Sequence, residues 1–200
     1  MHQLLSPADY RRMPWKNGGG RTLEIATEPP GAGTASFVWR VSVADIERDG
    51  PFSRFPGVDR TLVLLEGHGM RLTSDGGLLE MRAAFEPVRF PGESALHCAL
   101  VDGPTRDFNL MVRRDAARGD VVVVRDAGCA IEPARCLVCF AATGACECLI
   151  AGFPPIAVPP GHALLIAADP GAAVPAVHVL PAAAGSVALV AVVRAPAAAQ

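Results

Sequence analysis

The stretch that decides the fold is Phe37-Val38-Trp39-Arg40-Val41-Ser42-Val43-Ala44. It is rich in β-branched and aromatic residues, which favour strands, and its second half alternates between apolar and polar positions. In a strand, Arg40 and Ser42 project from one face, while Trp39 and Val41 project from the other. An arginine inside a small barrel is costly unless an acidic neighbour or a ligand carboxylate pairs with it. The opposite interpretation places Arg40 in solvent, and the residue pattern alone slightly favours it.

Short strand-like runs separated by turns extend in both directions from this stretch. The 200 residues include 18 prolines and 20 glycines, which leave little room for long amphipathic helices. Asp75-Gly76-Gly77 is a strong hairpin signal. The pattern therefore predicts an all-β sandwich or barrel. The other apolar, strand-like runs cover residues 61–65, 69–73, 108–112, 121–124, 137–141, 163–166 and 186–193.

Composition restricts the classes of partner. Half of the residues are apolar, which is enough for a sizeable core and argues against disorder. The 18 basic and 20 acidic side chains give a net charge of −2, which argues against a nucleic-acid partner. No apolar run reaches the ~20 residues needed to span a bilayer, and the N-terminus shows no signal-peptide pattern. We therefore expect a cytoplasmic protein with reduced cysteines and no membrane partner.

A second polar strand is expected around residues 107–113. Asp107, Asn109 and Met111 would share one face of it, together with Arg113. Asp and Asn are poor strand residues, so their alternation needs a reason. One reason is that they line a polar pocket. An equally good alternative is that the strand starts late and Asp107 caps a turn.

The segment Trp15-Lys16-Asn17-Gly18-Gly19-Gly20 is the most unusual in the chain. Three glycines permit positive φ angles and close backbone approach, and they can expose amide groups to a ligand. Lys16 adds a charge, Asn17 a donor and an acceptor, and Trp15 a flat apolar wall. The alternative is a flexible turn after an N-terminal strand.

The residues 51–60 combine aromatic, proline and charged side chains without periodicity. They are typical of an ordered loop over the mouth of a barrel, where aromatic side chains commonly form the wall of a ligand site. A plain packing role for Phe52 and Phe55 is an equally good interpretation.

Six cysteines offer a different hypothesis. Cys136-x-x-Cys139 and Cys146-x-Cys148 could bind zinc in a stabilising, structural site. However, the odd offset sends Cys136 and Cys139 to opposite faces of a strand. Buried thiols without a metal are the favoured interpretation.

The ordered motifs of the first half resemble the HutD/Ves family. The resemblance covers about half of the chain, becomes diffuse beyond Arg114, and does not include the cysteine-rich stretch. It rests on Met13–Gly20 with Thr22 and Glu24-Ile25, on Phe37-x-Trp39-Arg40-x-Ser42-x-Ala44-x-Ile46, on Gly50-Pro51-Phe52-Ser53-x-Phe55-Pro56-Gly57 with Asp59-Arg60, on Leu65-Glu66-Gly67-x-Gly69-Met70, on Phe90-Pro91-Gly92-Glu93, and on Asp102-Gly103-Pro104 with Asp107-Phe108-Asn109-Leu110-Met111.

The resemblance implies a bicupin, in which two cupin-like β-barrel or jelly-roll halves follow one another. We place the motif-bearing half at residues 1–115 and the second half at residues 116–200. The resemblance also implies a role in histidine utilisation as a regulator, without an established catalytic activity. A homodimer is expected only by analogy with other cupins.

A cupin metal site usually needs two histidines separated by one residue, followed by a glutamate and a later histidine. No two histidines of this chain are close together, so we expect no metal or other cofactor in the pocket, and His68 is expected in a turn. The five histidines are His2, His68, His97, His162 and His178.

These observations lead to a binding hypothesis and an enzymatic alternative. In the first, a small carboxylate binds to Arg40 with support from Lys16 or Arg60, while Asp107 and Asn109 accept hydrogen bonds from the ligand. In the alternative, a metal-independent isomerase or lyase uses Asp107 as a base and Lys16 as an acid. The predicted ligand-binding residues are Trp15, Lys16, Asn17, Arg40, Ser42, Arg60, Asp107 and Asn109.

Overall fold

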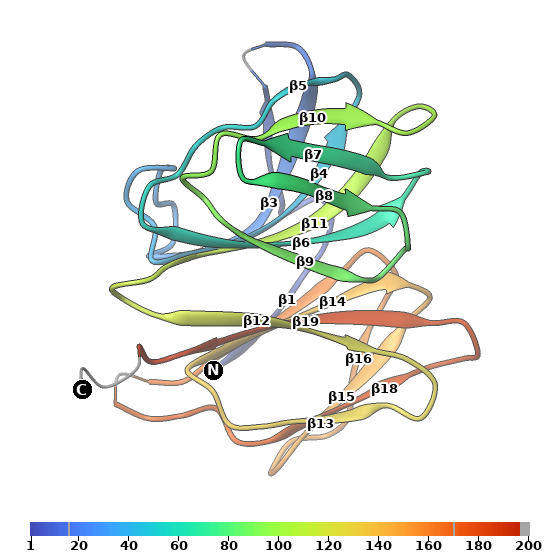
Figure 1. Cartoon of the computed structure of the whole chain (residues 1–200). Coiled ribbons are helices and arrows are strands. Elements are labelled where there is room, and N and C mark those ends of the chain that lie inside the picture. The colour runs from blue at the N-terminus through green and yellow to red at the C-terminus, as the bar shows by residue number, and fades with distance from the viewer. Residues whose placement is uncertain (16, 170, 197–200) are drawn as a thin grey trace. The chain divides into compact units, whose positions relative to one another are not determined.

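The computed structural model describes residues 1–15, 17–169 and 171–196. All regular elements in this part of the chain are β-strands, which confirms the predicted all-β class (Figure 1). Helices that could cross a membrane are likewise absent from the described residues. The strands form two compact units. One unit comprises residues 11–116, and the other comprises residues 1–10 together with the residues from 117 onward.

The unit of residues 11–116, called the N-terminal unit below, consists of two antiparallel sheets. Side chains from both sheets, including Leu62, Leu72 and Met81, form one buried apolar cluster, so the sheets pack face to face. The larger sheet has the order β2 (Arg11–Pro14), β3 (Gly20–Glu28), β4 (Trp39–Ile46), β11 (Thr105–Arg113), β6 (Val58–Glu66), β9 (Pro87–Pro91). The smaller sheet has the order β5 (Gly50–Pro51), β10 (His97–Leu100), β7 (Met70–Ser74), β8 (Gly77–Met81).

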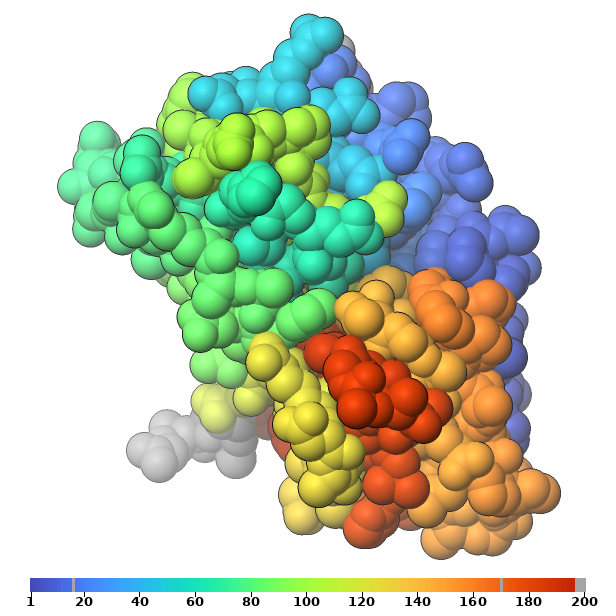
Figure 2. All heavy atoms as spheres, turned by 90° about the vertical axis from the view of Figure 1, so that its right-hand side faces the viewer, coloured from blue at the N-terminus to red at the C-terminus, as the bar shows by residue number. Residues whose placement is uncertain are grey.

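The second unit, called the C-terminal unit, is also built from two antiparallel sheets around one apolar cluster. Strands far apart in the sequence pair here, as β12 and β19 do. Figure 2 shows yellow and red segments of this unit side by side on one face. The larger sheet has the order β1 (His2–Leu5), β17 (Ala163–Ala167), β14 (Cys136–Thr143), β19 (Val187–Arg194), β12 (Arg118–Val124). The smaller sheet has the order β13 (Cys129–Ile131), β18 (Val177–Pro181), β15 (Cys146–Ile150), β16 (Ile156–Val158).

The two units repeat one strand order. In the N-terminal unit, eight consecutive strands are arranged as β4-β11-β6-β9 and β5-β10-β7-β8. In the C-terminal unit, the next eight are arranged as β12-β19-β14-β17 and β13-β18-β15-β16. Each set is thus an eight-stranded, two-sheet arrangement of the jelly-roll kind. The strands β1, β2 and β3 are additions at sheet edges.

The first ten residues group with the C-terminal unit, and not with the first half as the predicted boundary at residue 115 implies. Strand β1 pairs with β17 through all four of its residues, from His2 opposite Ile166 to Leu5 opposite Ala163. The hydroxyl of Tyr10 donates to the carbonyl oxygen of Gly161 at 2.8 Å and continues this attachment. The N-terminal unit therefore begins at β2.

Candidate functional site

A cavity of about 640 Å³ lies within the N-terminal unit. Its lining comes from the central strands of the larger sheet and from the segments that precede β3, β4 and β6. Both apolar and polar side chains line it, as is usual for small-molecule sites. They are Met13, Pro14, Trp15, Asn17, Thr22, Thr34, Arg40, Ala44, Pro51, Phe52, Ser53, Phe55, Arg60, Asp107, Asn109 and Met111.

Arg40 lies in the interior, so its placement in solvent is wrong. Strand β4 is buried along almost its whole length, and Arg40 is only 5% exposed. Its Nε donates to Oε2 of Glu24 at 2.6 Å, and Glu24 is itself buried. Its Nη1 contacts the sulfur of Met111 at 3.9 Å, which is a weak acceptor. One edge of the guanidinium is thus bound by an acidic neighbour.

Arg60 lies on the other side of Met111. Because β11 pairs with both β4 and β6, Met111 is opposite Arg40 on one side and opposite Arg60 on the other. The side chains of Arg40 and Arg60 are therefore in one row across the cavity wall. Both carry positive charge, so this row is the most cationic part of the site.

The guanidinium of Arg60 lies among three aromatic rings. Its Cζ is 5.3 Å from the ring centre of Phe52, 5.5 Å from Phe55 and 5.1 Å from Phe90. Its Nη1 donates to the carbonyl oxygen of Ser53 at 3.4 Å, while its buried Nε has no hydrogen-bond partner among the described residues. Burial lowers the pKa of Arg60 to about 10, although the nearby Asp107 carboxyl opposes this.

Asp107 and Asn109 contribute acceptors to the same wall. Strand β11 begins at Thr105, so the alternative in which Asp107 caps a turn before a late strand is wrong. Within the described residues, Oδ1 of Asp107 and Oδ1 of Asn109 are buried and lack hydrogen-bond partners. Burial raises the pKa of Asp107 to about 7, with Arg60 acting in the opposite direction. A buried carbonyl oxygen and a carboxyl group are thus ready to accept hydrogen bonds.

Ser42 lies in the same region but does not line the cavity. It is directly opposite Asn109 in the sheet and is 1% exposed. Its Oγ has no hydrogen-bond partner in the described part of the chain. Ser42 therefore lies in the wall between the positions of Arg40 and Ala44, both of which reach the cavity.

The glycine segment forms a turn at the cavity. The amide of Gly18, which has a φ of 68°, donates to the carbonyl oxygen of Trp15, and the amide of Gly19 donates to Oδ1 of Asn17. These two amides are bonded within the turn, so the expectation that they face a ligand is not met. Trp15 and Asn17 do line the cavity, and Nε1 of Trp15 donates to Oγ1 of Thr22 at 2.9 Å. Lys16 lies outside the described residues.

The segment after β5 lines the cavity as predicted for residues 51–60. Phe52 and Phe55 belong to both the cavity lining and the aromatic surroundings of Arg60. Arg60 itself lies within strand β6 and not in the loop. The loop therefore contributes aromatic walls, while the strand contributes the charge.

Glu24 is the main residue that sequence reasoning missed. It belongs to β3, next to Ser42 in the register of β3 and β4. The signal was available, because Thr22 and Glu24 alternate in an otherwise apolar run in the same way as Arg40 and Ser42 do. The partner of Arg40 could be identified only after β3 was placed beside β4.

The cysteines do not form the four-residue site of the zinc hypothesis. Cys139, Cys146 and Cys148 gather in the C-terminal unit, whereas Cys136 is not part of this group. Cys136 and Cys139 occupy opposite faces of β14, as their spacing predicted. His68 lies in the turn between β6 and β7, as expected.

The fold and the cavity define an all-β protein with cupin-like structural neighbours. Bacterial pirin in complex with nickel(II) from Escherichia coli is one of them, with a TM-score of 0.59 and 11% identity over 98% of this chain and all of that one. At this identity the similarity concerns the fold alone. The chain belongs to the HutD family, whose model matches residues 7–179.

Individual relatives agree with this membership. An uncharacterized 21.2 kDa protein in the hutC 3′ region of Pseudomonas putida is 42% identical over 150 residues, which are 75% of this chain and 78% of the relative. Protein Ves of Citrobacter koseri is 40% identical over 58% of this chain and 61% of its own length. HutD from Pseudomonas fluorescens SBW25 superposes with a TM-score of 0.80 and 30% identity, over 98% of this chain and all of that one.

Proposed function

We propose that the N-terminal unit binds a small carboxylate metabolite without a metal, and that the protein is a cytoplasmic modulator of histidine utilisation. The observation that carries the proposal is the row of Arg40 and Arg60 in one cavity wall, beside acceptors that lack partners. The link to histidine utilisation is supported by membership of the HutD family and by the hutC-region relative.

The two arginines suit a carboxylate. Nε of Arg40 is bound to Glu24, so Arg40 would present its Nη1 and Nη2 edge to the ligand as a two-pronged donor. Nε of Arg60 is buried and has no partner within the described chain, so an incoming oxygen would satisfy it. Both groups favour an anion with two oxygens.

The acceptors suit a ligand that also carries N–H groups. Oδ1 of Asp107 and Oδ1 of Asn109 can each accept a hydrogen bond. Both residues precede Met111 in β11, so they lie to one side of the row formed by Arg40 and Arg60. A metabolite with a carboxylate at one end and an amide, amidine or imidazole N–H at the other would satisfy both groups. Urocanate, formiminoglutamate and formylglutamate have this pattern.

We also infer that the chain is a bicupin whose two cupin-like halves correspond to the two units, with the first ten residues attached to the second half. The repeated eight-strand order of the two units supports this arrangement. The cavity lies within the N-terminal unit.

Calorimetric titration of metal-stripped protein with urocanate, histidine, formiminoglutamate and formylglutamate tests the proposed function. We expect micromolar binding of one of them, with the ligand recovered unchanged, and loss of that binding in Arg40→Ala. No binding across the panel would reject the link to histidine catabolism. Unchanged affinity in Arg40→Ala would reject the role of Arg40.

A metal-independent enzyme is the second candidate. The observation that favours it is the pKa of Asp107, which burial raises to about 7, in the range of a general base. Chemical change of the ligand, abolished in Asp107→Asn while binding is retained, would support this candidate. Binding with no change of the ligand in the unmodified protein would reject it.

A further inference from the structure

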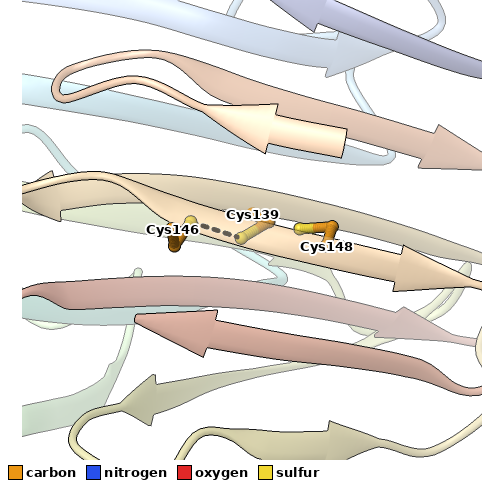
Figure 3. Close-up of side chains that lie close together, drawn as sticks. All are labelled: Cys139, Cys146 and Cys148. Carbon is orange, nitrogen blue, oxygen red and sulfur yellow. Dashed lines mark hydrogen bonds between the residues drawn. The ribbon is translucent and has the colours of Figure 1, made fainter. Parts of the chain in front are cut away.

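Three cysteine side chains meet inside the C-terminal unit, away from the cavity. Cys139 lies on β14 of the larger sheet, and Cys146 and Cys148 lie on β15 of the smaller sheet. Because Cys146 and Cys148 are two residues apart in one strand, they point to the same side of it. Their sulfur atoms turn toward that of Cys139 between the two sheets (Figure 3).

The sulfur atoms are close enough to share one ion. The Sγ atoms of Cys139 and Cys146 are 3.7 Å apart, and all three Sγ atoms lie within 4.8 Å of one another. A metal–sulfur bond of about 2.3 Å in a trigonal arrangement places the sulfurs about 4 Å apart. Only small side-chain rotations are therefore needed to bring the three sulfurs around a metal ion.

The surroundings of the three thiols decide which ion fits. The three cysteines are at most 2% exposed and belong to the apolar cluster that also contains Val158, Leu164 and Val179. Among the described residues, no fourth histidine, cysteine, aspartate or glutamate ligand joins them. Structural zinc sites are almost always four-coordinate, whereas soft monovalent ions accept three thiolates.

We propose that Cys139, Cys146 and Cys148 form a three-sulfur binding site for a soft monovalent metal ion, with Cu(I) as the ion of best fit. Thiolates are the ligands that select Cu(I), and the apolar side chains around them exclude water and harder ligands. Binding replaces thiol protons by the metal, so each thiol that becomes a ligand releases one proton.

The three thiols lie in a closed interior. The sulfur atoms of Cys139 and Cys146 are within hydrogen-bond distance, and either can be the donor. Since the metal enters a closed interior, loading requires transient separation of the two sheets near the connection between β14 and β15.

Titration of the reduced full-length protein with Cu(I) under anaerobic conditions, in competition with a chromogenic Cu(I) chelator, tests the proposal. We expect one Cu(I) per chain to be withdrawn from the chelator, and ultraviolet absorption from sulfur-to-copper charge transfer. Cys139→Val and Cys148→Val should lose this uptake while retaining the folded circular-dichroism spectrum. Cys98→Val, at a buried cysteine of the N-terminal unit, is the matched control and should retain it.

Three outcomes would overturn the proposal. The first is failure of the unmodified protein to withdraw Cu(I) from the chelator. The second is equal uptake by a folded Cys139→Val variant. The third is displacement of bound Cu(I) by equimolar Zn(II), which would show that the site prefers a four-coordinate ion. If Cys139→Val does not fold, Cys148→Ser provides the same comparison with a smaller change in volume.

Discussion

Nε of Arg40 and Oε2 of Glu24 are 2.6 Å apart, and both side chains are only 7% exposed. The second oxygen of Glu24 is 3.7 Å from Nη1 of the largely exposed Arg11. Glu24 therefore holds Arg40 in the wall of the cavity by one edge of its guanidinium. The remaining nitrogen atoms of Arg40 provide the donors that we assign to the ligand.

Replacement of Glu24 by glutamine should destabilise the N-terminal unit. The change leaves the buried Arg40 without a charged partner, and breaking a buried pair from one side costs about 3 kcal/mol. Urea denaturation measures this loss. Glu66→Gln is the matched control, because the Glu66 side chain is 69% exposed in its pair with Arg106 and should cost less than about 1 kcal/mol. Equal losses of unfolding free energy in the two variants would show that the buried pair of Arg40 and Glu24 stabilises the protein no more than an exposed pair does.

Replacement of Arg60 by methionine should separate stability from binding. Arg60 is buried without a carboxylate hydrogen-bonded to it, so an apolar chain of similar length should leave the free energy of unfolding unchanged or higher. Affinity for the carboxylate ligand should fall at least about tenfold, because a charged hydrogen bond is lost. Thermal unfolding and calorimetry measure the two quantities. Arg12→Met, at an exposed position, should alter neither; a large loss of stability in Arg60→Met would contradict the expectation.

Stability should depend on pH through Asp107. Burial raises its pKa in the folded protein from 3.8 to about 7, so the folded state binds the proton more tightly than the unfolded state. The contribution of Asp107 to the free energy of unfolding is therefore fully present below pH 4. It is lost as the pH rises through 7, and the total loss is up to about 4 kcal/mol.

Asp107→Asn should remove this dependence, because the amide does not titrate. The difference in unfolding free energy between the variant and the unmodified protein should favour the variant increasingly from pH 4 to pH 8. Denaturant titrations at several pH values measure it. Asp115→Asn, at an exposed position, should follow the unmodified protein, and parallel curves for all three proteins would exclude Asp107 as the source.

Replacement of Gly20 by alanine should destabilise the edge of the larger sheet. A Cβ atom at this position would overlap the carbonyl oxygen of Asp45 on the neighbouring strand. We expect a cost of about 2 kcal/mol, as for other overpacked sites, with weaker ligand binding because the turn after Trp15 shifts. Gly76→Ala is the control, since a Cβ atom there meets its nearest neighbour at 3.6 Å. A cost no larger than that of the control would mean that the strands separate easily here.

The period of two along a strand carried most of what the sequence predicted. It placed Arg40 beside Ser42 and Asp107 beside Asn109, and the register now shows Ser42 and Asn109 directly opposite each other. The charge of Arg40 and the alternation along its strand could not show whether its side chain faces solvent or the interior. The interior position of Arg40 depends on Glu24, which lies on the neighbouring strand β3 and accepts a hydrogen bond from Arg40. An irregularity in the register between Glu24 and Ala26 shifts the pairing of β3 with β4 at this point.

Two other features were beyond sequence reasoning because they join different sheets or repeats. Cys139 and Cys146 belong to different sheets, so their separation along the chain says nothing about the distance between their sulfurs. The strand repeat left no visible trace in the sequence, since the N-terminal repeat contains polar wall residues where the C-terminal repeat contains an aliphatic core with thiols. The two repeats therefore have the same strand order but different interior side chains.

The pairing of β1 with β17 sets an order of assembly during synthesis. The ribosome makes β1 before its partner strand β17, and all strands of the N-terminal unit are made between the two. The N-terminal unit can fold in the interval, because residues 11–116 contain all strands of its two sheets. Strand β1 therefore stays unpaired until β17 has been made. An unpaired edge strand is prone to aggregation. Expression at reduced temperature or with chaperones that bind extended chains should therefore raise the yield of folded protein.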